Sequence, residues 1–131
     1  DITRMAAVRR PPEGYEAVHA AVEQAVQAAL DAARPGARAA DVDRAARAVI
    51  EAAGYGAQFV HRTGHGMGLE PHEPPWIAAG EETVLEPGMV FTIEPGIYLE
   101  GRFGLRLEEV VILHEDGPEV LSRLPRDLRV V

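Results

Sequence analysis

Two stretches in the first half of the chain repeat apolar residues at three- and four-residue steps, the spacing that places side chains on one face of a helix. In the first stretch Pro11-Pro12 precedes the repeat and Pro35-Gly36 follows it. Because Pro suits the first turn of a helix and Pro-Gly ends one, we predict a helix over residues 12–34. Its apolar stripe consists of Tyr15, Val18, Val22, Val26, Ala29 and Leu30.

The second stretch predicts a shorter helix that begins near Ala40 or Asp41 and ends at Gly54, which occupies the position after the last helical residues. Both predicted helices are rich in Ala, whose small side chain allows close packing of two helices. The face turned toward the core is expected to carry Val42, Ala45, Ala46, Val49, Ile50 and Ala53.

The second half of the chain has frequent Gly and Pro and only short apolar runs, which are typical of strands and turns. We predict strands over residues 89–94, 97–99 and 105–113, with residues 100–104 as a hairpin connection. Residues 1–8 also have the pattern of a strand. The order of strand, two helices and antiparallel sheet predicts an α+β fold in one domain, residues 1–131.

Composition narrows the classes of function. The chain has 131 residues, no Cys and a formal net charge of -8. The acidic residues are dispersed, so nucleic acid is not an expected partner. No apolar run approaches the roughly 20 residues of a membrane span and no signal pattern begins the chain, so we expect no membrane contact and a cytoplasmic location. Without Cys, a metal site would depend on His, Asp and Glu.

Three of the five His lie within twelve residues, at His61, His65 and His72. Glycines flank His65 on both sides, and without side chains they allow an ion or a substrate to approach the backbone closely. This pattern indicates a binding site, while a surface loop that happens to be rich in His is the alternative.

Two carboxylates lie among apolar residues of predicted strands, Glu94 after Ile93 and Glu108 after Leu107. A buried carboxylate without a partner costs several kcal/mol, so each should pair, take up a proton or bind a metal. The alternatives are an ion pair with Arg106 or a strand face exposed to solvent.

Four separated motifs carry a resemblance to a known family. In order they are Asp1-Ile2-Thr3-Arg4, Gly64-His65-Gly66, Thr92-Ile93-Glu94-Pro95-Gly96 and Gly104-Leu105-Arg106-Leu107-Glu108-Glu109. They resemble the "pita-bread" metallopeptidases, which include prolidase, aminopeptidase P and methionine aminopeptidase. The last motif favours the Xaa-Pro branch, although it departs from the family pattern by Leu105, Leu107 and Glu109. Methionine aminopeptidase, a metal-free binding module and a creatinase-like hydrolase remain the alternatives.

The resemblance implies a dinuclear centre of Mn or Co, with Zn also suitable, that activates water to cleave the bond before proline. The implied metal ligands are Asp1, His65, Glu94 and Glu108. Glu94 would also move a proton, His72 and His61 would hydrogen-bond the substrate carbonyl, and Arg106 would orient Glu108 or Asp1. The implied partner is a peptide with proline at its second position, and the implied assembly is a homodimer.

The resemblance further implies a fifth ligand, an aspartate upstream of Asp1. We therefore expect the chain to be the C-terminal part of a catalytic domain and inactive by itself. Tyr98, Trp76 and Phe103 are expected to be packing residues outside the site.

Overall fold

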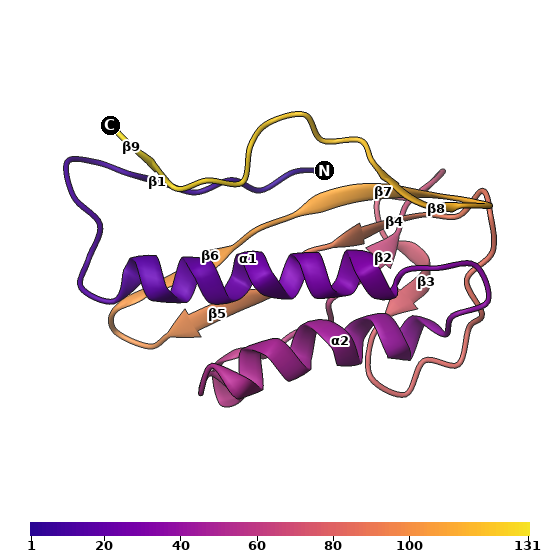
Figure 1. The fold of residues 1–131 in the computed structure, drawn as a ribbon, viewed down its shortest axis with the longest axis horizontal. Coiled ribbons are helices and arrows are strands. Elements are labelled where there is room, and N and C mark those ends of the chain that lie inside the picture. The colour runs from indigo at the N-terminus through magenta and orange to yellow at the C-terminus, as the bar shows by residue number, and fades with distance from the viewer.

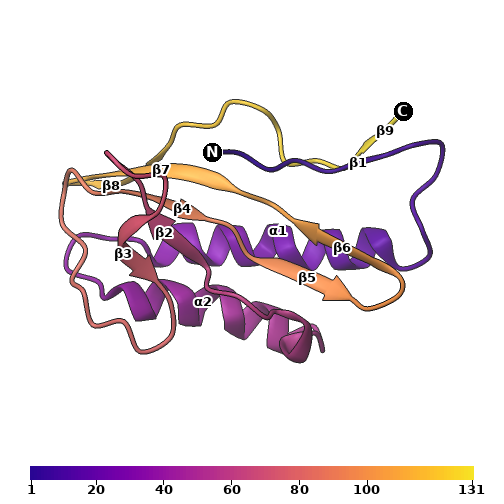
Figure 2. The same cartoon turned by 180° about the vertical axis from the view of Figure 1, so that it is seen from behind.

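In a computed structural model that describes residues 1–131, two helices lie on one face of the strands and no helix covers the opposite face (Figure 1; Figure 2). Helix α1 spans Tyr15–Ala32 and helix α2 spans Ala39–Ala52, and a short 3-10 turn, η1, follows at Gly56–Gln58. The predicted α+β arrangement of two helices on an antiparallel sheet is therefore confirmed.

Both helices end where their sequence signals predict. Gly54 follows α2 in the left-handed conformation with φ 86°, which a residue with a side chain adopts only with strain. Two details of the prediction are wrong. Pro12 lies in the turn before α1, where its carbonyl accepts from the Tyr15 N–H at 3.1 Å. Ala53 is exposed, because it lies past the last turn of α2 and no longer faces the core.

The main sheet has five strands in the order β3-β2-β4-β7-β8, and every neighbouring pair is antiparallel. Its strands are β2 at Gly64–Gly66, β3 at Glu73–Ile77, β4 at Val90–Ile93, β7 at Glu109–His114 and β8 at Gly117–Val120. Strands β5 at Gly96–Leu99 and β6 at Phe103–Arg106 form a separate hairpin around a turn at residues 100–102. The strands β2, β3 and β8 were not predicted individually.

The predicted strand over residues 105–113 is interrupted. On one side of the interruption Ile93 pairs with Glu109, and on the other Gly96 pairs with Arg106. Strands β4 and β5 are therefore one arm of a long ribbon, and β6 and β7 are the other arm. Pro95 has no N–H to donate, so the ladder cannot continue regularly through it. The register is the same on both sides of the interruption, so Glu94 on one arm lies opposite Glu108 on the other.

The opening strand is shorter than predicted. Thr3 forms a single bridge with Glu108, and strand β1 at Ala6–Ala7 runs parallel to β9 at Arg129–Val130. The first and last segments of the chain consequently lie side by side at one edge of the molecule (Figure 1). A sequence pattern alone could not reveal this pairing, because the partners are separated by more than 100 residues.

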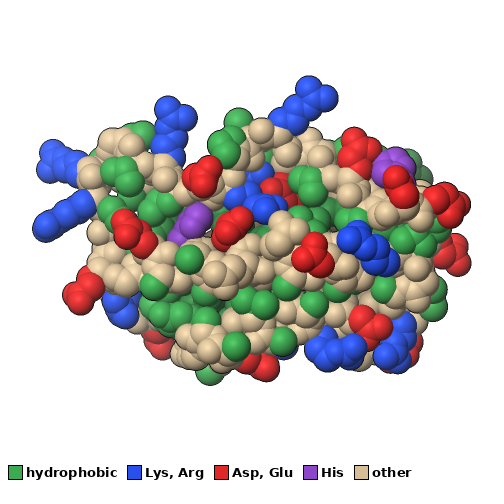
Figure 3. All heavy atoms as spheres, in the orientation of Figure 1, with side chains coloured by type: hydrophobic (Ala, Val, Ile, Leu, Met, Phe, Trp, Pro, Cys, Tyr) green, Lys and Arg blue, Asp and Glu red, His purple; other side chains and the backbone are tan.

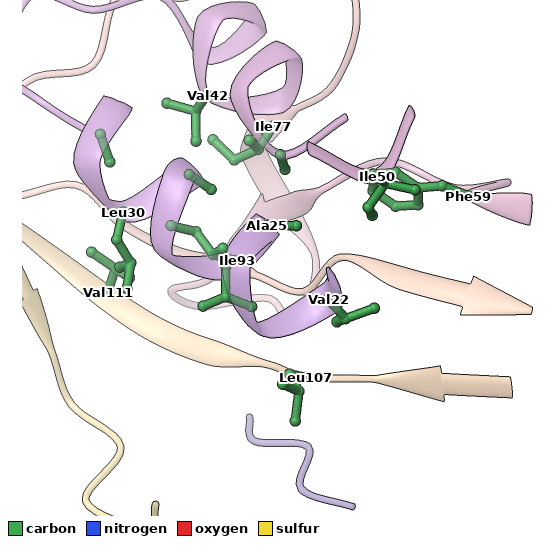
Figure 4. Close-up of a cluster of buried hydrophobic side chains, with 14 of the residues drawn as sticks. Val22, Ala25, Leu30, Val42, Ile50, Phe59, Ile77, Ile93, Leu107 and Val111 are labelled. Carbon is green, nitrogen blue, oxygen red and sulfur yellow. The ribbon is translucent and has the colours of Figure 1, made fainter. Parts of the chain in front are cut away.

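The core lies between α1, α2 and the covered face of the sheet. Figure 4 shows Val22 and Ala25 of α1 close to Ile93 of the sheet, while Ile50 of α2 lies beside Phe59. All five side chains belong to one cluster of 23 buried residues. Burying a Val, Leu or Ile side chain contributes about 1.5–3 kcal/mol, so this cluster fixes the helices against the strands that carry the site.

The surface in Figure 3 shows acidic and basic side chains interspersed over one face, with small apolar areas between them. Neither helix combines the length and the apolar character that a membrane crossing requires.

Candidate active site

Four predicted metal ligands come together where the pairing of the ribbon is interrupted. Ligand atoms of Asp1, His65 and Glu108 all lie within 4.8 Å of one another. Glu94 joins them through its Oε1, which lies 3.2 Å from Nε2 of His65. These residues come from the first segment, from β2 and from the two arms of the ribbon.

Strand β2 can lie this close to β4 only because the residues on either side of His65 are glycines. A Cβ on Gly64 would lie 1.9 Å from the carbonyl oxygen of Thr92, so a side chain there would force β2 away from β4. The N–H of His65 donates to Oγ1 of Thr92 at 3.0 Å. Its Nδ1 lies 3.0 Å from the Gly66 carbonyl, which can only accept, so Nδ1 carries the proton. Nε2 is therefore the ring nitrogen that faces the carboxylates.

The charges at this point fit a divalent cation. His65 and Glu108 are each 2% exposed and Glu94 is 9% exposed. The single guanidinium of Arg106 lies 3.5 Å from both Glu94 and Glu108, while Asp1 adds a third carboxylate. One positive charge does not offset the two buried carboxylates of Glu94 and Glu108, to which the exposed Asp1 adds a third negative charge. Carboxylate oxygens with one imidazole nitrogen are suitable ligands for Mn, Co or Zn.

Arg106 was considered both as an ion-pair partner of the carboxylates and as a residue that orients Glu108 or Asp1, and it makes contacts of both kinds. It is an ion-pair partner of Glu94 and Glu108, and it also donates to Oγ1 of Thr3 from Nε at 3.1 Å and from Nη2 at 2.9 Å. The same Thr3 hydroxyl donates to Oε2 of Glu108 at 2.5 Å. Arg106 therefore holds Glu108 directly and through Thr3. It forms no hydrogen bond or ion pair with Asp1.

The other two predicted histidines lie beside the ligands. A cavity of about 380 Å³ is lined by six residues, His61, Arg62, His65, His72, Glu94 and Arg106. His72 is exposed, and its ring centre lies 4.2 Å from that of His65. A larger cavity of about 870 Å³, between α1 and the segment after β7, contains none of the predicted site residues.

Tyr98, expected to be a packing residue outside the site, contacts one of the predicted site residues. Its hydroxyl lies 2.9 Å from Nε2 of His61. Burial raises the pKa of the Tyr98 phenol, the Arg106 guanidinium lowers it, and the carboxylates of Glu94 and Glu108 raise it further. The phenol is consequently protonated at neutral pH and donates to His61. Nothing in the spacing of the sequence revealed this, because the partners are 37 residues apart.

The other aromatic residues have packing partners. The guanidinium of Arg62 lies 4.5 Å from the ring centre of Trp76. Phe103 packs against the core, with its ring centre 4.9 Å from that of Tyr15.

Two threonines were also missed as site residues, although both lie in the quoted motifs. Thr92 donates to Oε1 of Glu94 at 3.0 Å, and Thr3 contacts Glu108 as described above. In a strand, residues two positions apart point to the same face, so the spacing of Thr92 and Glu94 could have indicated this contact.

Comparison with known proteins decides the family. The pattern of metallopeptidase family M24 matches residues 1–115. The chain belongs to this family. The Xaa-Pro dipeptidase of Lactobacillus delbrueckii subsp. lactis is 44% identical to this chain over all 131 residues. The match covers 36% of that dipeptidase.

Solved structures show the same fold in other M24 proteins. A dipeptidase from Mycobacterium ulcerans has a TM-score of 0.97 and 47% identity, covering 100% of this chain and 35% of that one. An X-Pro aminopeptidase from Thermotoga maritima has a TM-score of 0.96 and 46% identity, covering 100% of this chain and 37% of that one. The chain thus spans little more than a third of the length of these relatives.

Proposed function

We propose that the full-length protein carrying this chain is a metal-dependent peptidase that hydrolyses the bond before proline. The observation that carries this proposal is the convergence of Asp1, His65, Glu94 and Glu108 at the ribbon break, with more negative charge than Arg106 can offset. The relatives named as Xaa-Pro dipeptidase and X-Pro aminopeptidase support the substrate class.

The ligand set supports divalent ions at Asp1, His65, Glu94 and Glu108, with Mn or Co as the proposed metals and Zn as a further candidate. When bound, such ions would polarise the scissile carbonyl and lower the pKa of an attacking water. The tautomer of His65 supports this assignment, since its Nδ1–H bond to the Gly66 carbonyl leaves Nε2 free to act as a ligand.

The remaining polar groups suit the handling of protons and of the substrate carbonyl. Glu94 can accept a proton from water and return it to the departing proline nitrogen, and the Thr92 hydroxyl fixes its Oε1. His72 is exposed at the cavity, where it can donate to the substrate carbonyl. His61 lies at the same cavity, and its ring is oriented by Tyr98 and by the Arg62 carbonyl at 2.7 Å.

Two further predictions concern the whole protein. The homodimer that the resemblance implies and the cytoplasmic location expected from the sequence pattern both stay predictions.

The proposal is tested by Glu94→Ala in the full-length protein. Because Glu94 is proposed both to bind metal and to move the proton, this change should abolish cleavage of a Xaa-Pro dipeptide while leaving the fold intact. Retention of more than about a tenth of the wild-type kcat, or under about 1.4 kcal/mol of lost transition-state stabilisation, would contradict the assignment.

The matched control is Glu100→Ala, since Glu100 is an exposed residue of the turn between β5 and β6. This variant should keep its activity. A dipeptide of the same first residue followed by Ala tests the substrate class. If the wild-type protein cleaves both dipeptides equally well, the proposed preference for proline is wrong.

A further inference from the structure

An ion pair on α2 between the buried Asp43 and the partly exposed Arg47 contacts the loop before β2. Asp43 is 1% exposed, and Arg47 one helical turn later donates to both of its oxygens, from Nη2 and from Nε at 3.0 Å each. Oδ1 of Asp43 also accepts from the Thr63 N–H at 3.2 Å and from the Thr63 hydroxyl at 2.7 Å. The pair therefore binds the loop that precedes β2.

Arg47 holds the same loop at two further points. Its Nη1 donates to the Phe59 carbonyl at 3.1 Å, and its Nη2 donates to the His61 carbonyl at 3.0 Å. The guanidinium also lies 4.2 Å from the centre of the Phe59 ring. The centres of the Phe59 and His61 rings are 5.2 Å apart, and the two rings are nearly perpendicular. Both the backbone and the ring of His61 thus rest on contacts with Arg47.

Thr63, which Asp43 binds, is itself hydrogen-bonded to Glu94, the proposed proton carrier. The carbonyl of Thr63 accepts from the backbone N–H of Glu94 at 2.7 Å. Asp43 therefore fixes a residue whose backbone in turn fixes Glu94 at the ribbon break. Through Thr63 and Arg47, one ion pair reaches the two sides of the cavity that carry His61 and Glu94.

The chemistry of the pair points to positioning rather than to stability alone. Replacing a buried ion pair by apolar residues of similar volume is often neutral or stabilising, so such a pair is weak evidence of a contribution to stability. This pair additionally binds two loop carbonyls and one hydroxyl, and it shares the Thr63 N–H with the Ile77 carbonyl, so all four groups that it contacts belong to residues 59–63. An apolar replacement could not make these bonds.

We propose that Asp43 and Arg47 are positioning residues that hold His61 and the backbone of Glu94 in the geometry that peptide hydrolysis requires. This inference rests on the proposed function of the site. Neither residue touches the cavity that the predicted ligands line, so both act only through the loop at residues 59–63.

The test compares Asp43→Asn with Asp41→Asn in the full-length protein. Asp41 lies on the same helix and is also paired with arginines, Arg38 and Arg44, but it does not contact the loop. Asp43→Asn should lower kcat for a Xaa-Pro dipeptide about 10- to 100-fold, as changes to residues that orient metal-site groups do. KM should change by less than about threefold, and metal content should not change. Asp41→Asn should stay within about twofold of wild type.

Amide hydrogen exchange provides a readout that does not depend on activity. The amides of Thr63 and Glu94 should exchange faster in Asp43→Asn than in Asp41→Asn, at a temperature where thermal unfolding shows both variants to be folded. A kcat within about twofold of the control, or a loss of metal that accounts for the whole loss of kcat, would overturn the inference.

A milder variant keeps the inference testable if Asp43→Asn does not fold. Arg47→Lys retains the charge but not the planar fork, so it cannot reach both carboxylate oxygens and both carbonyls together. It should lower kcat in the same direction, and an unchanged kcat would overturn the inference. If wild-type protein does not cleave Xaa-Pro peptides, the proposed function fails, and the exchange at Thr63 and Glu94 still decides whether the pair holds the loop.

Discussion

At the scale of single residues, the buried carboxylates differ in how completely they are neutralised. Glu109 receives two bonds from Nη2 of Arg4, at 2.8 and 2.9 Å. Glu94 and Glu108 instead share Arg106, at 3.5 Å each. Because a shared guanidinium leaves part of the negative charge without a partner, a further cation is needed at Glu94 and Glu108 but not at Glu109.

The two neighbouring histidines should respond differently to substitution. His65→Ala removes a proposed ligand and should lower the metal content, whereas His72→Ala removes a group at the cavity and should lower kcat with metal retained. Metal analysis and kinetics on both variants of the full-length protein check this. Equal loss of metal in the two variants would show that His72 is itself a ligand.

At the scale of elements, the site depends on the register of the long ribbon and on the short strand β2. In the ribbon of β4–β5 and β6–β7 the regular pairing is interrupted at Pro95, and the N–H groups of Glu94 and Glu108 donate outside the ribbon, to the carbonyls of Thr63 and Thr3. Strand β2 is only three residues long and carries His65 between two glycines. In the register of the ribbon Glu94 lies opposite Glu108, so both side chains point to one face, and Oε1 of Glu94 lies 3.2 Å from Nε2 of His65.

Gly64→Ala should destabilise the protein more than an ordinary glycine substitution. The added Cβ would lie 1.9 Å from the Thr92 carbonyl oxygen, which belongs to the backbone of β4 and cannot move alone. We expect a loss of about 3 kcal/mol or more in the free energy of unfolding, at the upper end of overpacking effects.

Gly80→Ala is the control for this prediction, measured by denaturant unfolding of the full-length protein. Gly80 has φ 77° and nothing within 4 Å of its added Cβ, so only backbone strain of about 1–2 kcal/mol is expected. Equal losses in the two variants would show that β2 can move away from β4 without cost.

At the scale of the whole molecule, Arg4 connects both ends of the chain to the site. It donates to the Leu124 carbonyl from Nε at 3.0 Å and from Nη2 at 2.7 Å, and to the Glu108 carbonyl from Nη1 at 2.8 Å. Together with its bonds to Glu109, these contacts hold the first segment, which carries Asp1, against the strand that carries Glu108. The geometry of the proposed ligands is thus set partly by the C-terminal segment.

Arg4→Ala should lower the free energy of unfolding by about 3–5 kcal/mol, because it leaves Glu109 buried without its main partner. Arg126 at 3.6 Å from Glu109 would offset only part of this loss. The control is Arg123→Ala, an exposed arginine, which should change stability by less than about 0.5 kcal/mol. Thermal or denaturant unfolding of both variants decides, and equal stabilities would contradict the role given to Arg4.

The 131-residue chain expressed alone should not hold two metal ions tightly. It contains four of the five ligands that the family resemblance implies, so one ion would have too few anionic oxygens to offset its dehydration. Calorimetric titration with Mn²⁺ or Co²⁺ and a Xaa-Pro hydrolysis assay measure this directly. Two tight sites with turnover would show that the fifth ligand is dispensable or is supplied by a second copy.

Local patterns were sufficient to predict the two helices and the strands β4, β5 and β7, although not β2, β3 and β8. The apolar spacing of α1 and α2, with Gly54 after α2, reflects interactions among residues that are close in the sequence. A local pattern is therefore enough to predict them. The motifs around His65, Glu94 and Glu108 similarly indicated which side chains carry chemistry, because each is marked by its immediate neighbours.

Only the tertiary structure decided how these side chains meet and what supports them. The bonds from Thr3 to Glu108, from His61 to Tyr98 and from Asp43 to Thr63 join residues that are 105, 37 and 20 positions apart. Each depends on the packing of whole elements, so no local pattern could reveal it. The sequence by itself determined the helices and the candidate chemical groups, while long-range packing determined the geometry in which those groups lie together.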